Sequence, residues 1–169
     1  MGALLSAGDF ERVLGSLHGI DVCGTLRAIG KTVFAETDPH ELIRRYLAEL
    51  DVLVGGSSVF NVLAHCDYPR RYWPAERVGD YDDSDFEEEY RTVFRTLASS
   101  GRALEINTRS PMASVSQLRW WWEEGGDAVS FGSDAHEPSR VGDRFDVAVD
   151  VAEAAGFRAG RDRFDFWRR

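Results

Sequence analysis

The chain is poor in cysteine and has no long apolar run, and both shortages exclude classes of protein. Its two cysteines, Cys23 and Cys66, form neither a CxxC motif nor a disulfide framework, which favours a reducing cytoplasm. No apolar run approaches the roughly 20 residues that span a bilayer, and no secretory signal opens the chain. The first residues, MGALLS, match the loose myristoylation pattern, although they fit the tail of a helix capped by Gly8 better. We therefore expect a cytoplasmic protein that does not bind membranes.

Basic residues are also scarce. The 169 residues include 20 Lys and Arg against 29 Asp and Glu, which gives a formal net charge of -9. Such a chain lacks the basic face that replaces the counterions of a nucleic acid, so no nucleic-acid partner is expected. Hydrophobic residues at 43% and charged residues at 29% are typical of a globular protein. The length suits one domain over residues 1–169.

Four short segments are apolar over most of their length and end in polar residues, which is typical of strands. Continuous rather than alternating apolarity indicates parallel strands that are covered on both faces. The segments are RVLGSLH at 12–18, FNVLAH at 60–65, ALEIN at 103–107 and AVSFGSD at 128–134.

Helical patterns follow these strands at 38–50, 84–101, 114–126 and 143–156. Asp38 and Ser114 are expected to cap two of these helices, and Ser84 with Glu87 forms a predicted capping box. The three tryptophans at 120–122 are expected to pack in the core rather than to bind a ligand. The alternation of strands and helices predicts a parallel α/β sheet, either open or closed as a barrel.

Polar side chains gather at the carboxyl ends of all four predicted strands. Because parallel α/β barrels carry their chemistry at this rim, we expect these side chains to lie close together. They are His18, His65 with Asp67, Glu105 with Asn107, and Asp134 with His136. The fourth histidine, His40, lies in the first turn of a helix and is expected in solvent.

Each of these residues also has an ordinary interpretation. A histidine after a strand is often a hydrogen-bonded loop residue, Asp134 could close a turn or cap a helix, and Asn107 could bridge two loops. The convergence of histidines and aspartates on one rim nevertheless favours a divalent metal site. Neutral imidazole and carboxylate together suit Zn²⁺, Mn²⁺ or Fe²⁺, and a lack of cysteine ligands is typical of a catalytic site.

Two arginines, Arg70 and Arg71, follow His65 on a loop that is expected to overhang the same rim. A guanidinium beside a divalent metal ion suits a phosphoryl substrate, because the planar fork matches the phosphate oxygens. The alternative is that both arginines are solvated beside Tyr72 and Trp73.

The ordered motifs resemble the polymerase and histidinol phosphatase (PHP) superfamily, in its histidinol-phosphatase branch. VLGSLHGID and VLAHCD resemble strands that end in a metal-binding histidine. LEINTRS resembles a strand with an inward asparagine, and GSDAH resembles the last motif, a D-x-H pair. The match runs in order from about Asp9 to Gly156.

The resemblance implies a distorted barrel of seven β/α units that holds up to three metal ions. His18 and His65 would bind one ion, Asp134 a second and His136 a third, with Asp134 and His136 in the catalytic set. Arg70 or Arg71, together with Asn107, would bind the substrate. That substrate would be L-histidinol phosphate, a small phosphorylated metabolite of histidine biosynthesis, hydrolysed to L-histidinol and phosphate.

The chain departs from the family pattern at its beginning. Family members start with an H-x-H motif, followed by another histidine and a bridging glutamate, and nothing here corresponds to these residues. The sequence resembles only the C-terminal portion of the barrel, with four parallel strands and flanking helices, and lacks the first three β/α units. Such a half barrel would leave strand edges unpaired, so self-association through those edges is expected.

Three interpretations stay open at this point. The chain is the C-terminal part of a metal-dependent phosphatase whose first part lies upstream, a half barrel completed by another chain as a binding subunit, or a catalytically inactive remnant. A nuclease role, as in polymerase-associated relatives, is less favoured because of the acidic charge.

Overall fold

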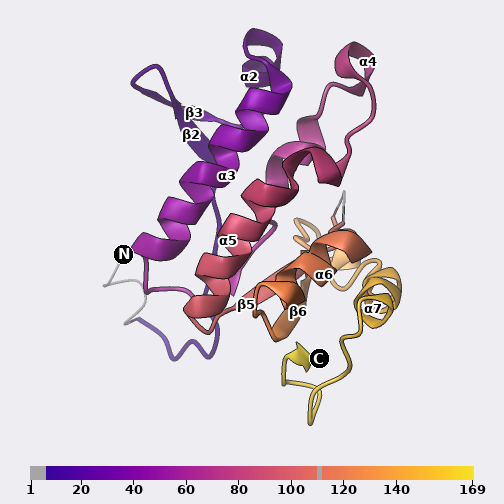
Figure 1. The fold of residues 1–169 in the computed structure, drawn as a ribbon. Coiled ribbons are helices and arrows are strands. Elements are labelled where there is room, and N and C mark those ends of the chain that lie inside the picture. The colour runs from indigo at the N-terminus through magenta and orange to yellow at the C-terminus, as the bar shows by residue number, and fades with distance from the viewer. Residues whose placement is uncertain (1–6, 110–111) are drawn as a thin grey trace.

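The computed structural model describes residues 7–109 and 112–169, so the myristoylation pattern at the start lies outside the described residues. The chain forms a mixed α/β fold (Figure 1) with a five-stranded sheet in the order β1-β4-β5-β6-β7. The strands are β1 (Leu14–Gly15), β4 (Val62–Leu63), β5 (Ala103–Asn107), β6 (Ala128–Gly132) and β7 (Trp167–Arg168).

The four predicted strands all form and pair in chain order. In this sheet the pairs β1–β4, β4–β5 and β5–β6 are parallel, and β7 runs antiparallel to β6. Parallel neighbours need long crossovers, which the helices supply. The α-helices are α2 (Lys31–Glu36), α3 (Pro39–Gly56), α4 (Ala75–Val78), α5 (Glu87–Ser99), α6 (Val115–Glu123) and α7 (Phe145–Ala154). None of the helices in the described ranges is long and apolar enough to cross a membrane.

The core lies between one face of the sheet and the helices, with α3 and α5 packed side by side (Figure 1). Among its fully buried side chains are Tyr46, Leu50, Phe94, Leu104, Trp121 and Val129. The Trp121 indole N–H donates to the carbonyl of Ala128 at 3.2 Å, which ties α6 to the start of β6. Trp120 is also buried, so the core interpretation is confirmed for these two tryptophans, whereas Trp122 is 37% exposed.

Two of the predicted caps are confirmed and one is wrong. Asp38 accepts from the N–H of Glu41, and Ser114 forms a capping box with Gln117. The predicted box of Ser84 and Glu87 does not form, because a 3₁₀ turn, η2 (Asp83–Phe86), precedes α5. Asp82 caps this turn and accepts from the N–H of Ser84.

The short helices α2 and α4 were not predicted from the sequence, and neither were two features of the β-structure. The predicted strand at 12–18 shortens to β1, and a hairpin of β2 (Gly19–Val22) and β3 (Thr25–Ala28) follows it. Its turn places Cys23 and Gly24 at φ 53° and 82°, the backbone that a tight hairpin requires. The second feature is β7, which the C-terminal segment adds to β6.

The alternation of side chains along β5 positions the polar site. All five residues of β5 are buried, and successive side chains point to opposite faces of a sheet. Leu104 and Ile106 belong to the core under the helices, so Glu105 and Asn107 point to the other face. Near the start of the strands, Phe166 from the C-terminal segment covers that second face.

Candidate functional site

The carboxyl ends of the strands surround one pocket of about 420 Å³. It is lined by His18, Tyr68, Arg71, Tyr72, Arg109, Asp134 and His136. Three of the four predicted metal ligands are among these residues. The fourth, His65, lies directly behind them, with its ring 5.0 Å from that of His18. The structure thus brings all four side chains together at the carboxyl-terminal edge of the sheet.

His18 and His65 form an imidazole pair against Tyr68. The Tyr68 ring lies 4.8 Å from His18 and 5.2 Å from His65, between ring centroids. His65 has φ 27°, a strained value for a residue with a side chain. Burial lowers its pKa to about 4, and its buried Nδ1 has no hydrogen-bond partner among residues 7–109 and 112–169. His65 is therefore neutral near pH 7.

Asp134 is held by two guanidinium groups. Arg71 donates from Nη1 to Oδ2 of Asp134 at 2.8 Å, and Nη1 of Arg109 lies 3.5 Å from the same oxygen. Partial burial raises the pKa of Asp134, but the hydrogen bond and charge of Arg71, with the charge of Arg109, outweigh it and lower the pKa overall. Asp134 also has a positive φ of 48°. The residue that opens the D-x-H motif is thus an ionised carboxylate on a strained backbone.

Of the two adjacent arginines, Arg71 faces the pocket and Arg70 does not. The Arg70 guanidinium lies 3.5 Å from Asp83 and 4.9 Å over the ring of Tyr81, away from the pocket. Arg71 also donates to Oδ1 of Asn107 at 3.0 Å. Consecutive residues of the 3₁₀ turn η1 (Tyr68–Tyr72) point in different directions, so only one of the pair reaches the pocket.

Arg109 is the functional candidate that sequence reasoning missed. Its Nη1 lies 2.6 Å from Nδ1 of the exposed His136, and its backbone N–H donates to Oδ1 of Asn107 at 3.0 Å. Its position could have indicated this role, because Arg109 lies two residues after Asn107, just past the end of a strand that carries polar residues.

A buried carboxylate supports this arrangement from behind. Oε2 of Glu105 accepts from the His65 backbone N–H at 2.9 Å and from Nδ2 of Asn107 at 3.1 Å. Burial raises the pKa of Glu105, although these two hydrogen bonds oppose the rise. Gly132 on β6 leaves the space for this carboxylate, because a Cβ there would lie 1.8 Å from Oε1 of Glu105. One buried group thereby positions both a histidine and the asparagine that orients Arg71.

Asp67 is also at the rim but does not line the pocket. It is buried, and within the part of the chain that the structure describes its Oδ2 has no hydrogen-bond partner. Burial raises its pKa to about 6, which the positive charge of Arg70 only partly offsets.

The donor set for a metal ion is incomplete within the part of the chain that the structure describes. Residues 7–109 and 112–169 contain no group of three or more His, Cys, Asp or Glu side chains that could hold an ion. Nδ1 of His65, which has no hydrogen-bond partner among the described residues, suits a metal ligand, but Oδ2 of Asp134 pairs with Arg71. The described residues therefore do not form a complete metal site by themselves.

Comparisons with known proteins were made on the sequence and on the fold. No family model matches the chain. A probable histidinol-phosphatase of Thermotoga maritima is 34% identical over 62% of this chain and 44% of its own length. The Deinococcus radiodurans protein of the same name is 30% identical over 89% of this chain and 56% of its own. The histidinol-phosphatase of Lactococcus lactis is 30% identical over 90% and 58%.

A solved structure has the same fold. The histidinol phosphate phosphatase of Lactococcus lactis, complexed with zinc, L-histidinol and phosphate, superposes with a TM-score of 0.74 at 23% identity. The superposition covers 93% of this chain and 61% of that one.

These similarities first define a class, a mixed α/β protein with the fold of a phosphatase whose solved structure contains zinc. The relatives then narrow the class to the histidinol-phosphatase branch, and the resemblance seen in the strand-end motifs is confirmed. The chain spans about half the length of the curated relatives it matches.

Proposed function

We propose that this chain carries the C-terminal part of a histidinol-phosphatase-type phosphoesterase site. The reaction would be the hydrolysis of L-histidinol phosphate, in which water adds to phosphorus, the P–O bond to the alcohol breaks, and a proton goes to the leaving alkoxide. In this proposal the sheet is the C-terminal portion of a seven-unit barrel. The names of the curated relatives and the fold of the solved phosphatase support both parts of the proposal.

The observation that carries the proposal is the pair of guanidinium groups at the pocket. Arg71 and Arg109 both approach Asp134, and Oδ1 of Asn107 accepts from the Arg71 guanidinium and from the Arg109 backbone N–H. Two guanidinium groups that line the same pocket suit the oxygens of a phosphate, which accept bidentate hydrogen bonds. Asp134 and His136 stand beside them as the proposed catalytic residues.

The proposed metal ligands remain His18, His65, Asp134 and His136, for Zn, Mn or Fe. The imidazole pair is the strongest part of this set, because Nδ1 of His65 has no hydrogen-bond partner among the described residues and its ring is neutral. The other metal ligands would have to come from residues that are not in this sequence.

A second candidate function is a catalytically inactive binding subunit or remnant. Two observations favour it: no three-ligand group occurs in the described ranges, and an arginine pairs with the carboxylate that a metal ion would need. In that case the chain would still bind phosphate but would not release it from an ester.

Two measurements on the 169-residue chain distinguish these functions. The first is phosphate release from L-histidinol phosphate with and without added Zn²⁺ or Mn²⁺. The second is the affinity for inorganic phosphate, measured by calorimetry on the chain and on Arg71→Met, with the exposed Arg119→Met as the matched control. Metal-dependent turnover supports the phosphatase, and binding that only Arg71→Met weakens, without turnover, supports the subunit. If the chain neither binds phosphate nor releases it from the ester, both proposed functions are overturned.

A further inference from the structure

A second cleft lies beside the pocket at the strand ends, which we call the phosphate pocket, and the proposed reaction does not use it. Its volume is about 560 Å³, and it lies between α2 and the segment from η1 to α4. We call it the α2–α4 cleft. Arg71 and Tyr72 line both spaces, so the cleft and the phosphate pocket are neighbours across one partition.

The cleft has fixed, aromatic walls. The Trp73 indole N–H donates to the carbonyl of Gly79 at 2.9 Å, and the Trp73 ring meets the Phe34 ring edge to face at 6.3 Å. Arg77 donates from Nη2 to the carbonyls of Phe34 and Thr37 at 2.7 and 3.0 Å, which ties α4 to the end of α2. Aromatic walls and a preformed cavity of this size are typical of a small-molecule site.

Positive charge predominates in the α2–α4 cleft. Three cationic side chains line it, those of Lys31, Arg71 and Arg77, against the single carboxylate of Glu76. Arg71 is already paired with Asp134 on the far side of the partition. Arg77 donates to main-chain carbonyls rather than to a carboxylate, so its charge is offset only by Glu76. One positive charge, that of Lys31, is therefore left over, and the cleft suits an anion.

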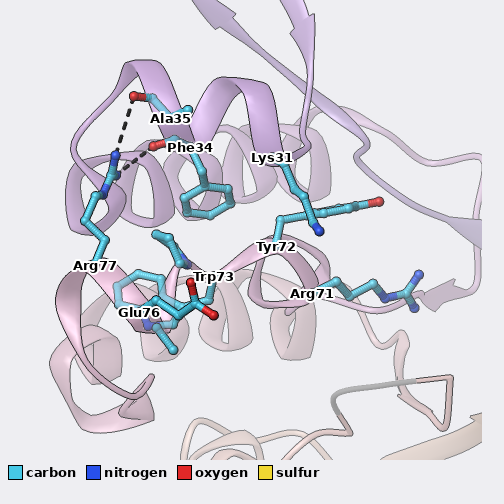
Figure 2. A pocket seen from close by; sticks show the side chains of 10 residues that line it. Lys31, Phe34, Ala35, Arg71, Tyr72, Trp73, Glu76 and Arg77 are labelled. Atoms are coloured by element: carbon cyan, nitrogen blue, oxygen red, sulfur yellow. Dashed lines mark hydrogen bonds between the residues drawn. The ribbon is translucent and has the colours of Figure 1, made fainter.

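Lys31 is the cation that the cleft offers to a ligand. Figure 2 shows its side chain beside Tyr72, whereas the Arg71 guanidinium points away from the cleft. Within residues 7–109 and 112–169, Lys31 forms no ion pair. The Glu76 carboxylate lies beside Trp73 (Figure 2), so it disfavours an anionic group there and leaves that wall to an uncharged ring.

We propose that the α2–α4 cleft binds a planar aromatic carboxylate, with its carboxylate at Lys31 and its ring against Trp73. A lysine ammonium is a compact charge with three donors, which suits a carboxylate. Aromatic rings pack against one another in offset or edge-to-face arrangements, which the Trp73 wall allows. This would be a separate binding function beside the phosphate pocket, and it does not depend on the phosphatase reaction.

The test uses the lysine itself as the reporter. Lys31 is the only lysine of the chain, so reductive methylation with isotope-labelled formaldehyde labels Lys31 and the N-terminal amine alone and keeps their charge. The full 169-residue chain is titrated by NMR with naphthoate, and with naphthamide as the uncharged probe that has the same ring. The Lys31 signal is assigned by its absence in Lys31→Met. We expect naphthoate to shift this signal saturably and to bind about fivefold more tightly than naphthamide, the size of one exposed ion pair.

Variants locate the probe. In calorimetry, Lys31→Met should weaken naphthoate about fivefold, and Lys31→Arg, which keeps the charge, should retain most of the affinity. Arg119→Met, at an exposed position on α6, is the matched control and should change nothing.

Three results would overturn the proposal. The first is an unmoved Lys31 signal, and the second is equal affinity for naphthoate and naphthamide. The third is a loss of naphthoate affinity in Arg109→Met as large as that in Lys31→Met. Arg109 lines the phosphate pocket and not the α2–α4 cleft, so this loss would place the probe in the phosphate pocket.

Discussion

The substitution Gly132→Ala tests whether the buried Glu105 carboxylate organises the site. The added methyl would lie 1.8 Å from Oε1 and 2.6 Å from the carboxyl carbon of Glu105, so the carboxylate must move. It would then give up the hydrogen bonds from the His65 N–H and from Asn107. Overpacking of this kind costs about 1–3 kcal/mol, and leaving a buried donor unpaired costs about 1–3 kcal/mol. We expect Gly132→Ala to lower the free energy of unfolding by about 3 kcal/mol.

Urea unfolding followed by tryptophan fluorescence measures this change, provided the m-value is constant. A double-mutant cycle isolates the cause. Glu105→Ala alone should cost about 2 kcal/mol because two donors lose their acceptor. The double variant Gly132→Ala with Glu105→Ala should cost at least about 1 kcal/mol less than the sum, since the methyl no longer meets a carboxylate. A loss below about 0.5 kcal/mol in Gly132→Ala, or simple additivity, would refute the reasoning.

Three further predictions concern single side chains. Burial raises the pKa of Asp67 to about 6, so its contribution to stability is present in acid and is lost as the pH rises through that value. In urea unfolding, the free energy of unfolding of Asp67→Asn should therefore exceed that of the native chain by about 2 kcal/mol at about pH 7.5 and equal it near pH 4. The control is Asp80→Asn, at an exposed position, which should match the native profile. Arg109→Met should weaken inorganic phosphate by about tenfold or more in calorimetry, and an effect no larger than that of Arg119→Met would contradict a role for Arg109 in anion binding. Phe166→Ala should cost about 2 kcal/mol in thermal or urea unfolding, because Phe166 covers the start of the sheet beneath Arg12, and a neutral result would show that the C-terminal segment does not stabilise the sheet.

Part of the site followed from the sequence because strand ends are local features. Each predicted strand ends within a few residues of the polar side chains that follow it. Parallel pairing alone brings those strand ends to one edge of the sheet. The sequence also indicated an arginine beside His65, but it could not separate Arg70 from Arg71. That choice depends on the turn η1 and on Asp83, which lies beside Arg70 and away from the pocket.

The amino-acid sequence by itself determined the alternation of strands and helices, the burial of Trp121, and the caps at Asp38 and Ser114. These features depend on neighbours within one or two turns of chain. Only the tertiary structure decided which groups meet across the pocket. Arg71 and Asp134 are 63 residues apart in the chain, and their contact engages Oδ2 of the carboxylate that the sequence predicted as a metal ligand. Ion pairs of this kind depend on how distant segments pack, because a charge removed from water pairs with the opposite charge that the fold places within reach.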